Sequence, residues 1–322
     1  MIFRKTIYSI ILSFITSILL SKSAISNLDK NKLNVTIHNL PKIKVITTIT
    51  DLQSIVEEVG GEDRVKVESF CKGAQDPHFL EAKPSFILNT SKADLIVSIG
   101  LGLEIGWLPK VLAGGRNPKV MEGASGYLEV GPKVKVLEIP TGPISRAEGD
   151  VHPEGNPHVT LDPIRVGEIA IVIAERLGTI QPVSANYFMN RAKNMQSRLK
   201  NKTKVWLERV KKSKFKKVVT HHKLLSYFFD RFGIDSIARL EPLPGVPPSP
   251  AHILKVMREA KLKGVKKILV EHYFSDSAAK KVAYQLKNML VKHTPVAVLA
   301  TPKIKTIDDL FEEIVSKIEE NS

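Results

Sequence analysis

The sequence has a single cysteine, Cys71, among its 322 residues. One cysteine excludes a disulfide framework and any cysteine-rich zinc module. No His-Glu-x-x-His segment occurs, so that zinc-hydrolase signature is also absent. The chain is nevertheless 43% hydrophobic and 25% charged, a composition that can bury a substantial core and is not that of a disordered protein. Its length predicts about two domains.

The N-terminus has the order of a secretory signal peptide. Two basic residues precede an apolar run, 7–20, and a stretch rich in small residues follows it. We predict that 1–26 is removed on export, after Ser23 or Ser26, and that the mature protein is free in the periplasm, because no cysteine follows that could carry a lipid anchor. The alternative is a retained membrane anchor, but the apolar run is shorter than the roughly 20 residues that a spanning helix needs.

The excess of basic residues is concentrated in one segment. The formal net charge is +15, and loss of 1–26 with its three basic side chains lowers it to +12. The segment 191–217 alone carries twelve lysine or arginine residues and one acid, Glu208. Such a run usually forms the solvated face of a helix, and aromatic residues that could stack on bases are few there. We therefore expect no nucleic-acid partner.

Short apolar runs rich in β-branched residues alternate with amphipathic stretches in two parts of the chain. The predicted strands are 43–49, 65–70, 95–99, 217–220, 236–240, 267–271 and 296–299. The predicted helices between them are 52–60, 85–93, 223–232, 251–263 and 277–292. Strands that alternate with helices form parallel sheets covered on both faces. The predicted fold class is therefore α/β, with two Rossmann-like parallel-sheet lobes.

A single long helix is predicted between the two lobes. Apolar side chains recur at steps of three, four or seven along 183–212, as in one stripe on a helix. The segment lacks glycine and proline, and its 30 residues would be about 45 Å long. A flexible hinge would instead be rich in glycine, serine or proline. We expect an N-terminal lobe over 40–182, a rigid linking helix over 183–213 and a C-terminal lobe over 214–322.

Three of the nine histidines, His78, His158 and His222, lie in loops near the carboxyl ends of predicted strands. Ligands of open α/β sheets gather at these ends. Three imidazoles that converge there from two lobes would hold a borderline cation such as zinc. Each histidine taken singly is more typical of a surface or capping residue, and that interpretation is kept for His38, His252, His272 and His293.

Short motifs accompany these histidines. They are Gln75-Asp76-Pro77-His78 with Pro84-Ser85, Gly102-Leu103-Glu104 with Trp107, Gly155-Asn156-Pro157-His158 with Leu161-Asp162-Pro163, His222 with Tyr227-Phe228, Glu241-Pro242, Pro248-Ser249-Pro250 and a strand ending in Glu271. Over 42–318 they resemble the metal-binding solute-binding proteins that supply zinc or manganese to ABC transporters. The resemblance implies two α/β lobes joined by one long helix, a metal ion in the cleft between the lobes, and an ABC permease as the partner of a monomer.

The resemblance also implies a set of metal ligands. Carried over by position, three of them are His78, His158 and His222. The fourth ligand in the family is usually a carboxylate in the loop after the last strand, where this chain has Ala300. Glu271, Asp308 or a water could take its place. The acidic stretch 148–154, with Asp150 and His152, is either a short counterpart of the family's metal-attracting loops or an ordinary solvated loop.

Imidazole ligands suit zinc, whereas manganese prefers oxygen-rich shells. We therefore expect the chain to capture zinc outside the cytoplasm and pass it to the permease, and not to be an enzyme. A manganese-specific protein of the same family is one alternative, and copper is not excluded by the ligand types. A zinc-dependent hydrolase is the other alternative, because three histidines with an open position also hold catalytic zinc.

Overall fold

The structure is a computed structural model that describes residues 40–73, 75–142, 152–243, 245–287 and 289–320. The predicted signal peptide, 1–26, lies outside the described residues. The chain separates into two units, Met1–Lys42 and Ile43–Ser322, and the second unit contains every described helix and strand.

The first sheet contains four parallel strands in the order β2-β1-β3-β4. They are β1 (Ile43–Thr47), β2 (Val65–Ser69), β3 (Leu95–Ser98) and β4 (Tyr127–Glu129), and the helices that follow the first three are α2 (Thr50–Gly60), α3 (Pro84–Lys92) and α4 (Leu108–Gly115). All residues of β3 are buried, as expected for a central strand of a parallel sheet with helices on both faces. The predictions for β1, β2, β3, α2 and α3 are confirmed within two residues at each end.

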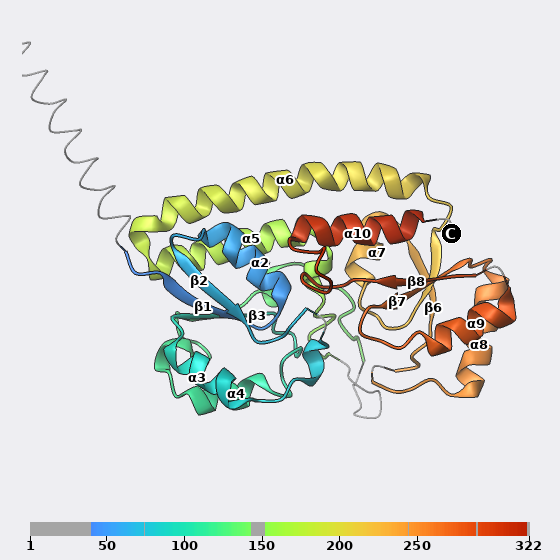
Figure 1. Cartoon of the computed structure of the whole chain (residues 1–322), viewed down its shortest axis with the longest axis horizontal. Helices are drawn as coiled ribbons and strands as arrows, with labels where there is room; N and C mark the ends of the chain where they lie inside the picture. The colour runs from blue at the N-terminus through green and yellow to red at the C-terminus, as the bar shows by residue number, and fades with distance from the viewer. Residues whose placement is uncertain (1–39, 74, 143–151, 244, 288, 321–322) are drawn as a thin grey trace, which may run out of the picture. The chain divides into compact units, whose positions relative to one another are not determined.

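The second sheet repeats this topology, in the order β6-β5-β7-β8. Its strands are β5 (Lys217–Thr220), β6 (Asp235–Arg239), β7 (Lys267–Glu271) and β8 (Leu290–Thr294). Helices α7 (Ser226–Phe232), α8 (Pro250–Leu262) and α9 (Ser277–Leu286) connect them, and α10 (Ile307–Glu319) follows. The predicted α/β class with two parallel-sheet lobes is confirmed (Figure 1).

Two helices, α5 (Pro163–Ile180) and α6 (Ala185–Lys212), lie between the two sheets in the sequence, and α6 runs beside α5 and α10 (Figure 1). One face of α6 is buried, at Phe188, Ala192, Met195, Leu199, Thr203, Trp206 and Val210. These positions are three or four residues apart, so they form the single apolar stripe that the sequence predicts. The long helix is confirmed. It begins at Ala185, after a 3-10 turn over Pro182–Ser184.

The prediction for the last strand is wrong. The predicted helix 277–292 ends at Leu286, and β8 occupies 290–294. The segment 296–299, predicted as the strand, is a loop in which Leu299 has a positive φ of 62°. Its valines are buried because the loop packs on α2, where the backbone N–H of Val298 donates to Oδ1 of Asp51 (2.7 Å). Burial without strand pairing therefore explains its apolar character.

Strand β4 and helices α4 and α10 are not among the predicted elements. Strand β4 is three residues long and, like β8, pairs with one neighbour only. An edge strand needs less apolar sequence than a central one, because part of its surface stays exposed. The sequence signal is correspondingly weak at β4 and β8, whereas the other two edge strands, β2 and β6, agree with the predicted strands 65–70 and 236–240.

Candidate metal centre

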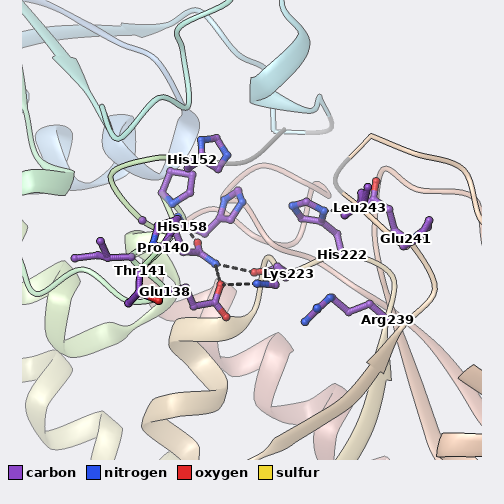
Figure 2. Close-up of a pocket in the computed structure, with 15 residues that line it drawn as sticks. Glu138, Pro140, Thr141, His152, His158, His222, Lys223, Arg239, Glu241 and Leu243 are labelled. Carbon is purple, nitrogen blue, oxygen red and sulfur yellow. Dashed lines mark hydrogen bonds and ion pairs between the residues drawn. The ribbon is translucent and has the colours of Figure 1, made fainter. Parts of the chain in front are cut away.

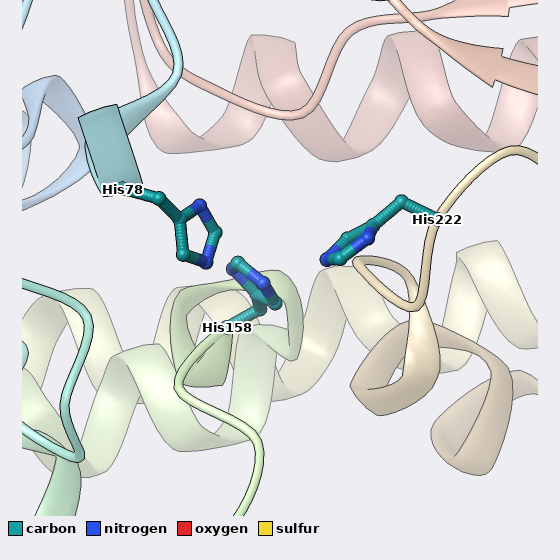
Figure 3. Close-up of side chains that lie close together, drawn as sticks. All are labelled: His78, His158 and His222. Carbon is teal, nitrogen blue, oxygen red and sulfur yellow. The ribbon is translucent and has the colours of Figure 1, made fainter. Parts of the chain in front are cut away.

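Three histidine side chains from separate loops meet at the carboxyl ends of the strands (Figure 3). His78 lies in a 3-10 turn after β2, His158 lies shortly before α5, and His222 lies two residues after β5. One ligand atom of each histidine lies within 4.8 Å of the other two. Tetrahedral nitrogens around zinc are about 3.4 Å apart, given bonds of about 2.1 Å. The structure thus brings together the three histidines that the sequence singles out, at a spacing that a small contraction would close around one ion.

The orientation of His78 follows from the Asp76-Pro77 segment before it. Oδ1 of Asp76 accepts from the backbone N–H of His78 (3.0 Å) and lies 2.7 Å from the ring nitrogen Nδ1 of His78. The indole N–H of Trp107 donates to the carbonyl of Pro77 (2.9 Å) and so anchors the turn. Burial would raise the pKa of Asp76, but the hydrogen bonds and charge of His78 outweigh it and hold that pKa below its ordinary value. With Nδ1 occupied, Nε2 of His78 is the nitrogen left for a metal ion.

His158 is held by an asparagine that spans the two lobes. Oδ1 of Asn156 accepts from the backbone N–H of His158 (3.0 Å), and Nδ2 donates to the carbonyl of Lys223 (3.0 Å). The hydroxyl of Tyr227 on α7 donates to the carbonyl of Asn156 (2.6 Å). Burial, and then the nearby histidines, keep the pKa of His158 well below its ordinary value. The ring is therefore neutral at neutral pH, the state that ligates a metal.

His222 is oriented by two glutamates. Oε2 of Glu241 lies 2.5 Å from Nδ1 of His222, and Oε1 of Glu241 accepts from the backbone N–H of Gly245 (2.6 Å). Oε1 of Glu271, at the end of β7, accepts from the backbone N–H of His222 (3.2 Å). A carboxylate behind a ligating imidazole fixes its tautomer and raises its basicity. The Glu241-Pro motif therefore contributes to the orientation of His222.

The structure does not bring Glu271 into the group of three histidines. Its carboxyl group is completely buried behind His222, and this burial raises its pKa to about 8. The possibility that Asp308 is a ligand is wrong: Asp308 lies on α10, where its Oδ2 pairs with Arg198 (2.9 Å) and Lys202 (3.1 Å). Of the other candidates, Glu271 and a water remain predictions.

His152 is a neighbour of the group that the sequence does not single out as a ligand. Its Nε2 lies 3.3 Å from Nε2 of His78, and the two ring centroids are 5.4 Å apart. Its position within the acidic stretch 148–154 was the only signal, and residues 148–151 lie outside the described residues. A metal-attracting role for this stretch stays a prediction.

Glu104, in the Gly102-Leu103-Glu104 motif, has a structural role. Its carboxylate accepts from the hydroxyl of Thr48 (2.6 Å) and from the backbone N–H groups of Ile99 (2.9 Å) and Gly100 (3.0 Å). Burial raises the pKa of Glu104 to about 7, against the effect of these hydrogen bonds. Glu104 therefore secures the loop after β3.

A cavity of about 470 Å³ adjoins the histidines (Figure 2). Its walls include His152, His158 and His222 together with other polar or charged side chains, namely Glu138, Thr141, Lys223, Arg239 and Glu241. Nδ2 of Asn156 donates to Oε2 of Glu138 (3.0 Å) at the boundary between the two lobes. The candidate centre is therefore open to a space much larger than a metal ion.

Two parallel-sheet lobes with functional side chains at their facing strand ends define the class of solute-binding proteins that hold cargo in a cleft. The chain belongs to the family described as zinc-uptake complex component A, periplasmic, whose sequence profile matches residues 45–321. Members of this family are solute-binding proteins of ABC transporters and not enzymes, in agreement with the prediction for this chain and against the hydrolase alternative.

Curated relatives carry names that refer to two metals. The zinc-binding lipoprotein AdcA of Streptococcus pneumoniae is 25% identical over 273 residues, which cover 84% of this chain and 51% of that protein. The manganese ABC transporter substrate-binding lipoprotein PsaA of Streptococcus mitis is 25% identical over 252 residues, which cover 75% and 76%. The chain thus spans about half the length of AdcA.

Solved structures share the fold. The crystal structure of ZnuA superposes with a TM-score of 0.72 at 21% identity and covers 88% of this chain and 100% of that chain. A cadmium-bound periplasmic metal binding protein from Candidatus Liberibacter asiaticus gives a TM-score of 0.70 at 21% identity, with coverage of 86% and 98%. At these identities the likeness establishes the fold alone.

Proposed function

We propose that the protein captures a zinc ion between its lobes and delivers it to an ABC permease. The observation that carries this proposal is the convergence of one nitrogen from each of His78, His158 and His222 within 4.8 Å. Two of the rings have a carboxylate at Nδ1, and the third is kept neutral by burial. Outer carboxylates of this kind orient and strengthen imidazole ligands of metals.

The types of ligand atom in the group favour zinc over manganese. The group contains three nitrogens, and among the described residues no carboxylate belongs to it. The Irving–Williams order puts zinc above manganese for nitrogen ligands, and manganese favours oxygen-rich octahedral shells. The name of AdcA, a zinc-binding relative, agrees with this choice, whereas that of PsaA favours manganese.

The proposed setting is outside the cytoplasm. It combines removal of residues 1–26, a free monomer in the periplasm, and lobes over 40–182 and 214–322 with a connector over 183–213. No helix in the described part of the chain is long and apolar enough to cross a membrane. The curated relatives compared above are named lipoproteins, so the proposal of a free protein differs from them and is tested by radiolabelled-lipid incorporation during expression.

The proposal is tested by chelator competition with the purified protein. His78→Ala, His158→Ala and His222→Ala, made singly, should each weaken zinc binding by about tenfold or more, because loss of a ligand costs at least as much as loss of a side chain that supports one. His293→Ala is the matched control, since His293 is half-exposed and pairs with Asp276 away from the group. Unchanged affinity in two of the three variants would contradict the site.

The choice of metal is tested by dialysis against equal free zinc and manganese, followed by metal analysis. We expect predominantly zinc. An absorption spectrum at the zinc edge should then count three nitrogen neighbours and identify the remaining ligand. Glu271→Gln should leave the number of oxygen neighbours of zinc unchanged if the fourth ligand is a water, and lower that number by one if Glu271 ligates. Predominant manganese would overturn the ligand argument.

A further inference from the structure

The cavity beside the histidines has the size of a small-molecule site. A single metal ion with its three imidazoles would leave most of the 470 Å³ to other occupants. Ligand sites in proteins commonly measure about 300 to 1,000 Å³ and combine apolar walls with a few polar groups. The walls here fit that description, with the apolar Ile139, Pro140 and Leu243 near charged residues.

One cation on the cavity wall has no counter-charge in the part of the chain that the structure describes. Nζ of Lys223 pairs with Oε2 of Glu138 (3.6 Å), and Glu241 pairs with His222. Arg239, the last residue of β6, is exposed, and its side chain has no hydrogen bond or ion pair among the described residues, whereas its backbone carbonyl accepts from Nε2 of His252 (2.9 Å). Figure 2 shows the Arg239 side chain extending from the end of its strand toward Lys223. The guanidinium is thus available to an anion in the cavity.

A zinc ion at this site would also have a coordination position to fill. The carboxylates of Asp76 and Glu241, at Nδ1 of His78 and His222, would offset its double charge, so the need for a further ligand follows from the number of ligand atoms. Zinc is almost always four-coordinate in proteins, and the described group supplies three ligand atoms. An anion that enters from the cavity would meet the ion on one side and Arg239 on the other.

We propose that this site takes up zinc together with a small di- or tricarboxylate anion. One carboxylate oxygen coordinates the ion in place of a water, which leaves to solvent, and no proton or electron is transferred. A second carboxylate pairs with the guanidinium of Arg239, whose planar fork matches a carboxylate bidentately. The inference rests on the proposed zinc function and extends the cargo from a bare ion to an ion with its carboxylate partner.

The test uses succinate and butyrate, two four-carbon acids that differ by one carboxylate. The purified protein is loaded with Co²⁺ as a coloured substitute for zinc, and each acid is titrated while the visible absorption is recorded. Calorimetry with the zinc-loaded protein provides a second readout. We expect saturable binding of succinate at least about tenfold tighter than that of butyrate, the value of one charge-assisted pair.

Arg239→Ala should remove this difference and leave butyrate binding unchanged. Arg239→Lys should retain part of it, because lysine keeps the charge and loses the fork. Arg258→Ala is the matched control: Arg258 is an exposed arginine of α8 outside the cavity lining. Since the side chain of Arg239 is exposed, none of these variants should fail to fold, and circular dichroism verifies this.

The outcomes separate this inference from the proposed function. Zinc affinity in carboxylate-free buffer should be the same in the wild type and Arg239→Ala, and absence of zinc binding there would overturn the proposed function itself. Normal zinc binding without any spectral response to succinate, as expected if His152 or Glu271 completes the shell, would overturn the carboxylate inference alone. Equal affinities for succinate and butyrate in the wild type would do the same.

Discussion

Oε2 of Glu241 lies 2.5 Å from Nδ1 of His222, on the side of the ring opposite Nε2. Both groups are buried, and the other oxygen of Glu241 accepts from the backbone N–H of Gly245. Glu241 lies two residues after the end of β6, and His222 lies two residues after the end of β5. Since these strands are neighbours in the sheet, their parallel pairing carries the carboxylate to the imidazole.

Replacement of this carboxylate should weaken metal binding without removal of a ligand. In Glu241→Gln the amide oxygen can still accept from Nδ1–H, but the negative charge that raises the basicity of the ring is lost. We expect zinc affinity to fall about tenfold, the lower end of the range for such supporting groups. Chelator competition measures the change, with the exposed Glu122→Gln as control. An affinity equal to that of the wild type would mean that the pair is structural only.

The three histidines could be found from the sequence because parallel topology makes their positions equivalent. Each is predicted to lie in a loop near the carboxyl end of a strand, and the carboxyl ends of parallel strands lie at one edge of a sheet. The partners that orient them are harder to identify. Glu241 is 19 residues from His222 in sequence, and the neighbour of His78 in the cleft, His152, is 74 residues away. Those contacts depend on the paths of loops, which hydrophobic periodicity does not encode.

The error at β8 has a related cause. The sequence 277–292 is amphipathic throughout, so periodicity alone extends helix α9 into the next strand. The helix ends just before Lys287, which has a positive φ of 49°. No glycine or proline occurs in 277–292 that would predict this end from the sequence. The loop 296–299 has the apolar composition of a strand because it is buried against α2, not because it pairs.

Tyr227 connects α7 to the loop that carries His158. Its buried hydroxyl donates to the carbonyl of Asn156 (2.6 Å) and accepts from the backbone N–H of Leu137 (3.0 Å). Tyr227→Phe leaves both backbone groups without this partner, and we expect a loss of about 1–3 kcal/mol in the free energy of unfolding. Zinc affinity should also fall severalfold, because the His158 loop is less firmly held.

Chemical denaturation measures the first effect and chelator competition the second. Tyr284→Phe is the matched control, since Tyr284 is 85% exposed. Its hydroxyl is accessible to water, so removal of that hydroxyl should change the free energy of unfolding little. Equal stability of Tyr227→Phe and Tyr284→Phe would contradict the role given to the buried hydroxyl.

Glu104 should make the stability of the metal-free protein depend on pH. Its pKa is about 7 in the folded chain and near 4.5 when unfolded. Between these values the folded state holds a proton that the unfolded state releases, so stability increases as the pH falls from above 7 toward 4.5. The contribution is about 3 kcal/mol at most, given 1.36 kcal/mol for each pH unit.

Glu104→Gln removes this titration while every other group stays the same. Denaturation curves of both proteins with a chelator present, at several pH values across that range, isolate the effect as their difference. We expect the variant to lose stability relative to the wild type at every pH, because the amide faces the N–H of Gly100, and to lose more at acid pH. A constant difference would show that Glu104 does not titrate in this range.

Metal binding should change the relative position of the lobes only slightly. Helix α6 is continuous for 28 residues without glycine or proline, so it offers no local hinge and would have to bend along its length. Arg198, near its middle, donates to Glu58 of α2 (2.9 Å) and Asp308 of α10 (2.9 Å). The hydroxyl of Thr50 donates to the carbonyl of Val298 (2.6 Å) and adds a buried link between segments far apart in sequence.

We expect X-ray scattering curves of the apo and zinc-loaded protein to give the same radius of gyration within error. A double variant, Asn201→Gly with Lys204→Gly at two exposed positions of α6, costs about 1 kcal/mol of helix propensity and should enlarge the difference between the two states. A wild-type change as large as that of the double variant would contradict the view that α6 restrains the lobes.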